Sequence, residues 1–357
     1  MPYWRIFCGR KQFDMEVRAA LAALIDKRDF SQEEMLSLMH QIMQGELTPV
    51  QIAGILIGLR TKGETVIEIA AAAQVMRELS TKVPLSDTEH LVDTCGTGGD
   101  GAHTFNISTG AAFVAAAAGA KVAKHGGRSV SSTCGSADVL EALGVNVHLT
   151  PEQVAQAVQE IGLGFMFAPN HHSAMKHAAP VRRELGVRTL FNLLGPMTNP
   201  AGAKNQVMGV FHRDLVPKLA QVLKELGSRH VMVVHAADGL DEISLAGDTF
   251  VAELRDGKIS EYTLNPQQFD LCACPSEKLA VYNIDEAKTL LLAALDNVTG
   301  AARDIVALNA GAAIYVSGVA PSLKQGITQA QAVIASGAAK AKLAALVAFS
   351  KQFVEKL

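Results

Sequence analysis

The first part of the chain carries apolar residues at helical spacing. From residue 15 onward they recur every three or four positions, so that each segment presents one apolar face. Capping boxes, in which Ser or Thr stands three residues before Glu or Gln, occur at Ser31, Thr48 and Thr65. Two of these segments are followed by glycines that favour a helix stop, Gly45 and Gly63. The pattern predicts a small helical domain.

From residue 90 short apolar runs alternate with helical stretches. The runs predicted as strands are residues 90–94, 121–123, 165–168, 207–211 and 230–235. The helices predicted among them are residues 108–118, 151–161 and 215–226. A hairpin is predicted at 254–262, around Asp256-Gly257, and long helices at 285–295 and 327–354. Strands separated by helices predict an α/β domain with a central, mostly parallel sheet.

These patterns predict two domains and a short extension. Residues 15–86 form the helical domain, with a contribution from about residues 180–205, and residues 87–357 form the larger α/β domain. Residues 1–14 contain the only tryptophan and do not join the helical periodicity, so we expect a disordered or loosely packed extension. The chain has 357 residues, of which 49% are hydrophobic, and this is enough to bury a substantial core.

Charge and cysteine content narrow the partners and the location. The formal net charge of -3 gives no overall attraction to nucleic acid or to an anionic membrane, and we expect neither as a partner. The longest uncharged runs, residues 101–120 and 305–323, are interrupted by polar residues, Gly or Pro, and are not predicted to span a membrane. Five scattered cysteines without a secretory leader pattern predict a cytoplasmic protein.

The densest chemistry lies between residues 93 and 132. Glycines of the Gly96–Gly101 run let the backbone approach a ligand, hydroxyls and amides follow, and Lys124 and Arg128 add positive charge. This combination predicts a cradle for a phosphorylated metabolite. A dinucleotide fingerprint is excluded because no acidic residue lies between Asp100 and Asp138, and a P-loop because no Gly-Lys-Ser/Thr follows the glycines. The remaining alternative is a glycine-rich turn that serves only the fold.

Six motifs together resemble the anthranilate phosphoribosyltransferase family of tryptophan biosynthesis. They are Gly96-Thr97-Gly98-Gly99-Asp100, Asn106-Ile107-Ser108-Thr109, Lys124-His125-Gly126, Gly135-Ser136-Ala137-Asp138, Phe191-Asn192-Leu193-Leu194-Gly195-Pro196 and Asp241-Glu242. The resemblance covers nearly the whole chain from about Met15. It implies the fold of pyrimidine nucleoside phosphorylases, a homodimer formed through the helical part, and transfer of the phosphoribosyl group of 5-phosphoribosyl diphosphate to the amine of anthranilate, with release of diphosphate.

The resemblance also implies the residues that bind the phosphoribosyl diphosphate. These are Gly96, Gly99, Asp100, Thr104, Asn106, Ile107, Ser108, Thr109, Lys124, His125, Gly126, Gly127, Arg128, Ser129, Val130, Ser131, Ser132 and Ser136. Departure of diphosphate leaves oxocarbenium-like character on the ribose and negative charge on the leaving group, so this chemistry needs cations and donors more than a strong base. Lys124 is expected to neutralise the diphosphate.

Two Mg²⁺ ions per subunit are expected, with Ser108, Asp241 and Glu242 as protein ligands. Mg²⁺ prefers oxygen ligands, often few from the protein and the rest from substrate and water. Asp241 and Glu242 follow a predicted strand in a glycine-containing loop, where we expect their carboxylates to reach outward without burial. The alternative is a solvated acidic pair without a ligand.

Gly96, Gly127 and Arg182 are expected at the anthranilate site. Arg182 is assigned to the carboxylate, which its planar donors match, and Lys124, Arg182, Asp241 and Glu242 are the expected catalytic residues. Arg183 is the second choice, and a helix-surface salt bridge is the alternative for both arginines. The family usually carries Asn at the position of Gly127, where the Asn side chain contacts anthranilate. Gly lacks this hydrogen-bonding side chain, which affects the binding of the acceptor anthranilate more than that of the phosphoribosyl donor.

Several other residues have structural interpretations beside the functional ones. His171, His172 and His177 lack a carboxylate or Cys partner at metal-ligand spacing, so we expect them to line the path of the acceptor or to cap a helix. Cys95 and Cys134 are interpreted as packing residues. Two other functions remain open: a phosphorolytic enzyme of the same superfamily, and a non-catalytic relative that binds phosphoribosyl diphosphate or nucleic acid. The first should lack the metal-binding set, and the second should have lost part of it.

Overall fold

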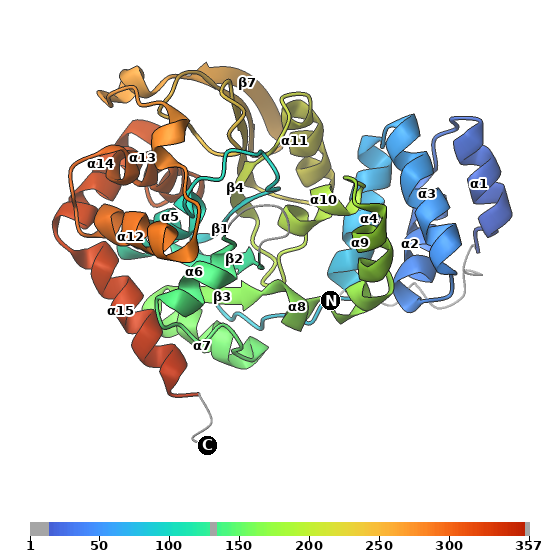
Figure 1. The fold of residues 1–357 in the computed structure, drawn as a ribbon, viewed down its shortest axis with the longest axis horizontal. Coiled ribbons are helices and arrows are strands. Elements are labelled where there is room, and N and C mark those ends of the chain that lie inside the picture. Colours follow the sequence, from blue (N-terminus) through green and yellow to red (C-terminus); the bar gives the residue numbers. More distant parts are fainter. Residues whose placement is uncertain (1–13, 129–133, 354–357) are drawn as a thin grey trace, which may run out of the picture. The chain divides into compact units, whose positions relative to one another are not determined.

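The computed structural model describes residues 14–128 and 134–353, which divide into two compact units (Figure 1). One unit comprises Met1–Leu79 and Ala174–Leu194, and the other comprises Ser80–Ser173 and Gly195–Leu357. The extension expected at residues 1–14 lies, apart from Asp14, outside the described residues.

The first unit is helical, as expected. Its helices are α1 (Val17–Ile25), α2 (Gln32–Gln44), α3 (Pro49–Lys62), α4 (Val66–Glu78), α9 (Ala179–Leu185) and α10 (Phe191–Leu194). The three capping boxes are confirmed at the starts of α2, α3 and α4, with side-chain and main-chain groups bonded reciprocally. The two glycine stops are confirmed as C-caps of α2 and α3. Local signals therefore specify these helices.

The second unit contains a seven-stranded sheet in the order β3-β2-β1-β4-β5-β6-β7. Its parallel strands are β1 (Leu91–Gly96), β2 (Lys121–Gly126), β3 (Leu163–Phe167), β4 (Asn205–Gly209) and β5 (His230–Ala236). The antiparallel hairpin of β6 (Thr249–Arg255) and β7 (Lys258–Leu264) completes it. The order reverses at β1, which lies between β2 and β4. Such a reversal leaves a crevice at the carboxyl ends of the strands, where α/β proteins bind ligands.

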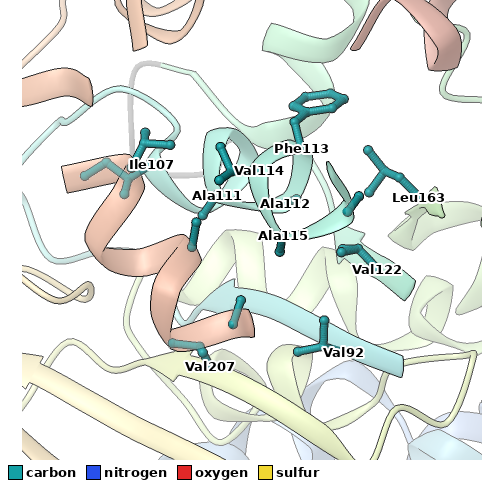
Figure 2. Close-up of a cluster of buried hydrophobic side chains, with 14 of the residues drawn as sticks. Val92, Ile107, Ala111, Ala112, Phe113, Val114, Ala115, Val122, Leu163 and Val207 are labelled. Atoms are coloured by element: carbon teal, nitrogen blue, oxygen red, sulfur yellow. The ribbon is translucent and has the colours of Figure 1, made fainter. Parts of the chain in front are cut away.

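Helices surround this sheet. They are α5 (Ile107–Ala117), α6 (Ser136–Ala142), α7 (Pro151–Ile161), α8 (Ala168–His171), α11 (Leu215–Glu225), α12 (Ile284–Leu295), α13 (Ala301–Val316), α14 (Leu323–Ala335) and α15 (Ala338–Lys351), with short 3-10 turns at Gly195–Met197, Pro266–Phe269 and Ser276–Leu279. A further 3-10 turn, Ser173–His177, belongs mostly to the helical unit. Helix α5 packs on β1 and β2 and against α13. Figure 2 shows its side chains beside Val92, Val122 and Leu163 of the sheet. Burial of α5 on several sides fixes its first turn at the end of β1.

One expectation for the C-terminal helices is wrong, and one C-terminal helix was not predicted. The helix predicted at 327–354 is broken into α14 and α15, which are bent by 69° at Ser336-Gly337, and Gly337 has φ +77. Helix α13 was not predicted because it is buried almost all round, with residues 305–314 all inaccessible, and so has no polar face to give a period. No single described helix is long and apolar enough to cross a membrane, and only the bent pair of α14 and α15 has the length and composition for one.

Candidate functional site

The predicted cradle lies at the carboxyl ends of the central strands. The Gly96–Gly101 run follows β1, Lys124 to Gly126 end β2, and Asp241-Glu242 comes in the loop after β5. Parallel strands end at the same edge of a sheet, so the topology gathers these segments at the reversal of strand order.

Two glycines allow the acidic loop to approach the strands closely. A Cβ on Gly96 would lie 2.4 Å from Asp241 Oδ2, and a Cβ on Gly209, at the end of β4, would lie 1.5 Å from the carbonyl oxygen of Asp241. Gly98, with φ +65, donates its main-chain N–H to Asp241 Oδ2 at 2.8 Å. The glycine loop and the acidic loop are therefore directly joined.

The expectation that Asp241 and Glu242 reach outward without burial is wrong. Both residues are half-buried, and Glu242 Oε1 accepts a hydrogen bond from Ser108 N at 3.1 Å, at the start of α5. Burial, and then repulsion from Asp100 and Glu242, raises the pKa of Asp241 well above its ordinary range. Burial, with a contribution from Asp100, raises the pKa of Glu242 to about 7 although Lys124 opposes it.

This acidic group suits a divalent cation. A bound cation would reverse the pKa shifts, because it favours the ionised carboxylates. The oxygens of Asp241, Glu242 and the Ser108 hydroxyl are the donor type that Mg²⁺ prefers. Among residues 14–128 and 134–353 no three His, Cys, Asp or Glu side chains converge as a ready metal cage. The residues therefore fit an ion that keeps water or substrate oxygens among its ligands.

Lys124 is almost fully buried, at 3% exposure, in the floor of the cradle. Its ammonium donates to the carbonyl oxygen of Thr94 at 2.5 Å and to Ser108 Oγ at 3.1 Å. An ammonium has three N–H donors, so one remains for a ligand. Burial raises the pKa of the carboxyl groups of Asp93 and Glu242, and the charge of Lys124 opposes the rise in both.

The first turn of α5 offers buried polar atoms. Asn106 Oδ1 and Thr109 Oγ1 are inaccessible and have no hydrogen-bond partner in the described part of the chain. Buried polar atoms are rarely left without a partner. Asn106 Nδ2 is held by the carbonyl oxygen of Cys134 at 3.0 Å, and Ile107 and Ser108 begin the helix. Thr104 pairs with Ala280 in an isolated bridge. The main-chain N–H groups of Ile107, Ser108 and Thr109 are already bonded within the protein. The two side-chain oxygens without a partner therefore mark the ligand position.

The segment after β2 is held close to α6. A Cβ on Gly126 would lie 2.2 Å from Ser136 Oγ, and the carbonyl oxygen of Gly127 accepts from Ala137 N at 3.1 Å. The guanidinium of Arg128 is bonded to carboxylates of α6. The predicted phosphate contacts of Ser129, Val130, Ser131 and Ser132 lie outside the described residues and stay predictions.

Two buried histidines adjoin the cradle. The rings of His125 and His172 meet edge-on, with their centroids 5.1 Å apart. The Nε2 atoms of His125, His171 and His172 are buried and have no hydrogen-bond partner among the described residues. Burial, followed by the effect of neighbouring histidines, lowers the pKa of His125 to about 3 and that of His172 to about 4. Both rings are neutral at pH 7. His177 belongs to the helical unit, where it lies against Gly45 at the end of α2.

Arg182 lies on α9 of the helical unit. Its guanidinium is over the ring of Phe191, 5.4 Å from the centroid, and burial lowers its pKa. It forms no ion pair with any residue in the described ranges, so the salt-bridge alternative is absent there for Arg182. Arg183 on the same helix is exposed. A half-buried guanidinium without a carboxylate partner is suited to an anionic ligand.

The cysteines near the cradle are unsuited to nucleophilic chemistry. Burial raises the pKa of Cys134 to about 11 and that of Cys95 well above its ordinary range. Cys95 Sγ accepts a hydrogen bond from Gln206. Since the thiolate is the reactive form, their interpretation as packing residues agrees with their environment.

Sequence reasoning missed Asp93 and Asn199. The buried Asp93 accepts hydrogen bonds from Asn199 Nδ2 at 2.8 Å and from His125 N at 3.2 Å, and Asn199 Nδ2 also donates to the carbonyl oxygen of Ala123. The pair therefore joins β1, β2 and the segment before β4. A charged residue inside an apolar strand was the available signal.

Comparison with known proteins matches almost the whole chain. The glycosyl transferase family, helical bundle domain, matches residues 18–80, and the glycosyl transferase family, a/b domain, matches residues 88–340. Anthranilate phosphoribosyltransferase of Thiobacillus denitrificans is 66% identical over 333 residues, which cover 93% of this chain and 97% of that protein. The enzyme of the same name from Methylobacillus flagellatus is 65% identical over 337 residues, covering 94% and 99%.

Solved structures give the same assignment. The crystal structure of anthranilate phosphoribosyltransferase from Thermus thermophilus has a TM-score of 0.88 and 45% identity, covering 93% of this chain and 99% of that one. The enzyme of that name from Saccharomyces cerevisiae, in complex with phosphoribosyl diphosphate and Mg, has a TM-score of 0.84 and 26% identity, covering 96% and 100%.

Proposed function

This chain belongs to the anthranilate phosphoribosyltransferase family, and from that premise we propose which of its residues perform each part of the reaction. It transfers the 5-phosphoribosyl group of phosphoribosyl diphosphate to the amine of anthranilate, a step of tryptophan biosynthesis. One observation carries the residue assignment: the glycine loop and the first turn of α5 are both bonded to the acidic pair Asp241-Glu242. The predicted donor and metal residues thus form one continuous site.

The donor binds over the ends of β1 and β2. The glycine loop and the start of α5 receive the phosphates and the ribose, with the Thr109 hydroxyl donating to an oxygen of the donor and Asn106 Oδ1 accepting from a ribose hydroxyl. Main-chain groups from Lys124 to Arg128, with Ser136, receive the other phosphate. As the bond between ribose C1 and the diphosphate breaks, the third N–H of Lys124 stabilises the charge that develops on the leaving oxygen.

Two Mg²⁺ ions per subunit complete the donor site, held by Asp241, Glu242 and Ser108. When bound, they neutralise the diphosphate and stabilise the negative charge that grows on it. The raised pKa values of both carboxyl groups support this assignment, because burial and the neighbouring carboxylates disfavour their ionised forms and a divalent cation would restore them.

Arg182 binds the carboxylate of anthranilate. Its half-buried guanidinium without an ion pair in the described residues supports this role. The reaction needs the amine to form the C1–N bond and to lose one proton. The buried rings of His125 and His172, neutral at pH 7, keep their Nε2 atoms available for a ligand.

The enzyme acts as a cytoplasmic homodimer formed through its helical unit. Val50 and Ile57 lie seven residues apart on one face of α3 and are 81% and 38% exposed, and Ile25 on α1, which packs on α3, is 80% exposed. Ile67 on α4 of the same unit is 53% exposed. Exposed apolar residues grouped on one small unit support an association surface. Light scattering should give twice the chain mass, and Val50→Glu with Ile57→Glu should lower it.

Loss of anthranilate fluorescence tests the reaction. Purified protein should consume anthranilate only when phosphoribosyl diphosphate and Mg²⁺ are both present, and excess EDTA should stop it. Turnover that continues undiminished in EDTA contradicts the metal role. A phosphorolytic enzyme would instead use inorganic phosphate to cleave the C1–N bond of N-(5-phosphoribosyl)anthranilate, giving anthranilate and ribose 1,5-bisphosphate.

A further inference from the structure

Arg128 has a different environment from the other cations of the cradle. Its Nη1 donates to Asp138 Oδ1 at 2.9 Å and to Glu141 Oε2 at 2.6 Å, and its Nη2 donates to Glu141 Oε1 at 2.9 Å. The guanidinium also lies 5.6 Å from the ring centroid of Phe167. Two carboxylates therefore already neutralise the charge that sequence reasoning assigned to phosphate.

These carboxylates belong to α6, which carries Ser136. Asp138 Oδ2 accepts from Gly135 N at 2.8 Å at the start of that helix. Ser136 Oγ lies 3.4 Å from the carbonyl oxygen of Gly127, the residue before Arg128. The ion pairs thus span from the end of β2 to the first two turns of α6, and the proposed phosphate ligand Ser136 lies between these anchored points.

We propose that Arg128 is a positioning residue whose guanidinium, through Glu141 and Asp138, holds Ser136 in place for the donor and does not itself bind phosphate. This inference rests on the proposed function of the site. If the Arg128 guanidinium turned to phosphate, Glu141 and Asp138 would lose the positive charge of Arg128. The side chains of these two residues are only 33% and 17% exposed. A bidentate pair between a planar guanidinium and a carboxylate also has a fixed geometry, which suits a structural tie.

The expected contribution to overall stability is small. The Arg128 side chain is 49% exposed, and ion pairs at such exposure stabilise a fold little. The substitutions can therefore be studied in folded protein, and a change in substrate binding can be separated from unfolding by thermal denaturation.

A double-mutant cycle of Arg128→Ala and Glu141→Ala tests the inference. Each single variant should raise the KM for phosphoribosyl diphosphate, by roughly three- to tenfold for Arg128→Ala, because contacting residues couple at this level. The KM for anthranilate should stay within about twofold. The double variant should match Arg128→Ala alone, and Arg128→Lys should restore part of the loss. Calorimetric titration with phosphoribosyl diphosphate and Mg²⁺, without anthranilate, should reproduce the same order.

A direct phosphate contact predicts the opposite for Glu141. Removal of Glu141 would free Arg128 to bind phosphate, so Glu141→Ala would leave the KM for phosphoribosyl diphosphate unchanged or lower it. Either result overturns the positioning role. A double variant whose effect on this KM is the product of the effects of the two single variants overturns it as well. Arg303→Ala, which removes an arginine paired with Asp304 on α13, is the matched control and should change no kinetic constant. Inactive wild-type protein would contradict the proposed function itself, whereas active wild type with a neutral Glu141→Ala contradicts only this inference.

Discussion

Gly127 gives a direct test of the anthranilate site, because the family usually has Asn at this position. Its φ lies outside the left-handed region, and among residues 14–128 and 134–353 a Cβ would meet only the Cβ of Ala168, at 3.9 Å, which is ordinary van der Waals contact. Its carbonyl oxygen is held by Ala137 N at 3.1 Å. Gly127→Asn should therefore be accommodated without strain and without moving the main chain.

The expected gain is one neutral hydrogen bond to the acceptor. Such a bond is worth about 0.5 to 1.5 kcal/mol, so the KM for anthranilate should fall by roughly two- to tenfold. Gly127→Ala is the matched control, because it adds the Cβ without the amide and should leave this KM within about twofold. Both substitutions reduce the freedom of the unfolded chain, so neither should lower the melting temperature.

The assay is the loss of anthranilate fluorescence at saturating phosphoribosyl diphosphate and Mg²⁺. Michaelis curves for wild type, Gly127→Asn and Gly127→Ala give the KM for anthranilate of each. An unchanged or higher value in folded Gly127→Asn would refute the reasoning and mean that the acceptor site is built around the glycine. If Gly127→Ala lowers the KM as much as Gly127→Asn, the effect comes from a stiffer backbone and the amide has no role.

Three further substitutions test other parts of the chain. Asp241→Ala together with Glu242→Ala should lower kcat/KM at least about a hundredfold, on the order of 2.7 kcal/mol. The melting temperature should not fall, since the double substitution removes like charges that lie close together. Turnover near that of wild type at limiting Mg²⁺ would contradict the metal role. Arg182→Ala should raise the KM for anthranilate about tenfold to a hundredfold, for a charge-assisted contact of roughly 1.5 to 3 kcal/mol, and equal rises for both substrates would indicate a structural role. Although burial opposes it, hydrogen bonds from His230 and two tyrosines lower the pKa of Glu253 to about 2. The stability that this carboxylate contributes is present above its pKa in the unfolded chain, about 4.5, and is lost as the pH falls toward 2. Between pH 5 and pH 2 the free energy of unfolding, measured with denaturant, should therefore fall by about 3 kcal/mol more for wild type than for Glu253→Gln. Equal losses would show that the pKa shift is absent.

The sequence could predict elements whose signals are local. The capping boxes and one-sided apolar faces of α2, α3 and α4 depend on residues within a few positions, and the structure confirms all three. Helix α13 lacks such a signal because its buried surface extends around the helix, including Asn309, whose amide is satisfied by the distant main chain of Ile243. Its assignment requires knowledge of the tertiary packing.

The candidate site shows the same division. The glycine loop and the Lys124-His125-Gly126 segment are contiguous motifs, and the sequence was sufficient to select them. The burial of Asp241 was not predictable, because it depends on Gly96 and Gly209, which lie 145 and 32 residues away and have no side chain at the contact. The bond between Asp93 and Asn199 likewise joins residues 106 positions apart.

The charges gathered by these long-range contacts argue for the metal requirement independently of the family. Asp100, Asp241 and Glu242 influence one another, and Lys124 is the cation that acts on Glu242. Three ionised carboxylates and one ammonium leave an excess of negative charge. Burial is the main cause that raises the pKa of Glu242 to about 7, and Asp100 adds to the rise. A diphosphate entering this position adds further negative charge and is repelled unless cations accompany it. The acidic pair therefore favours a donor that arrives with divalent ions over the free anion, and a phosphate-binding site built without them would not bury these carboxylates together.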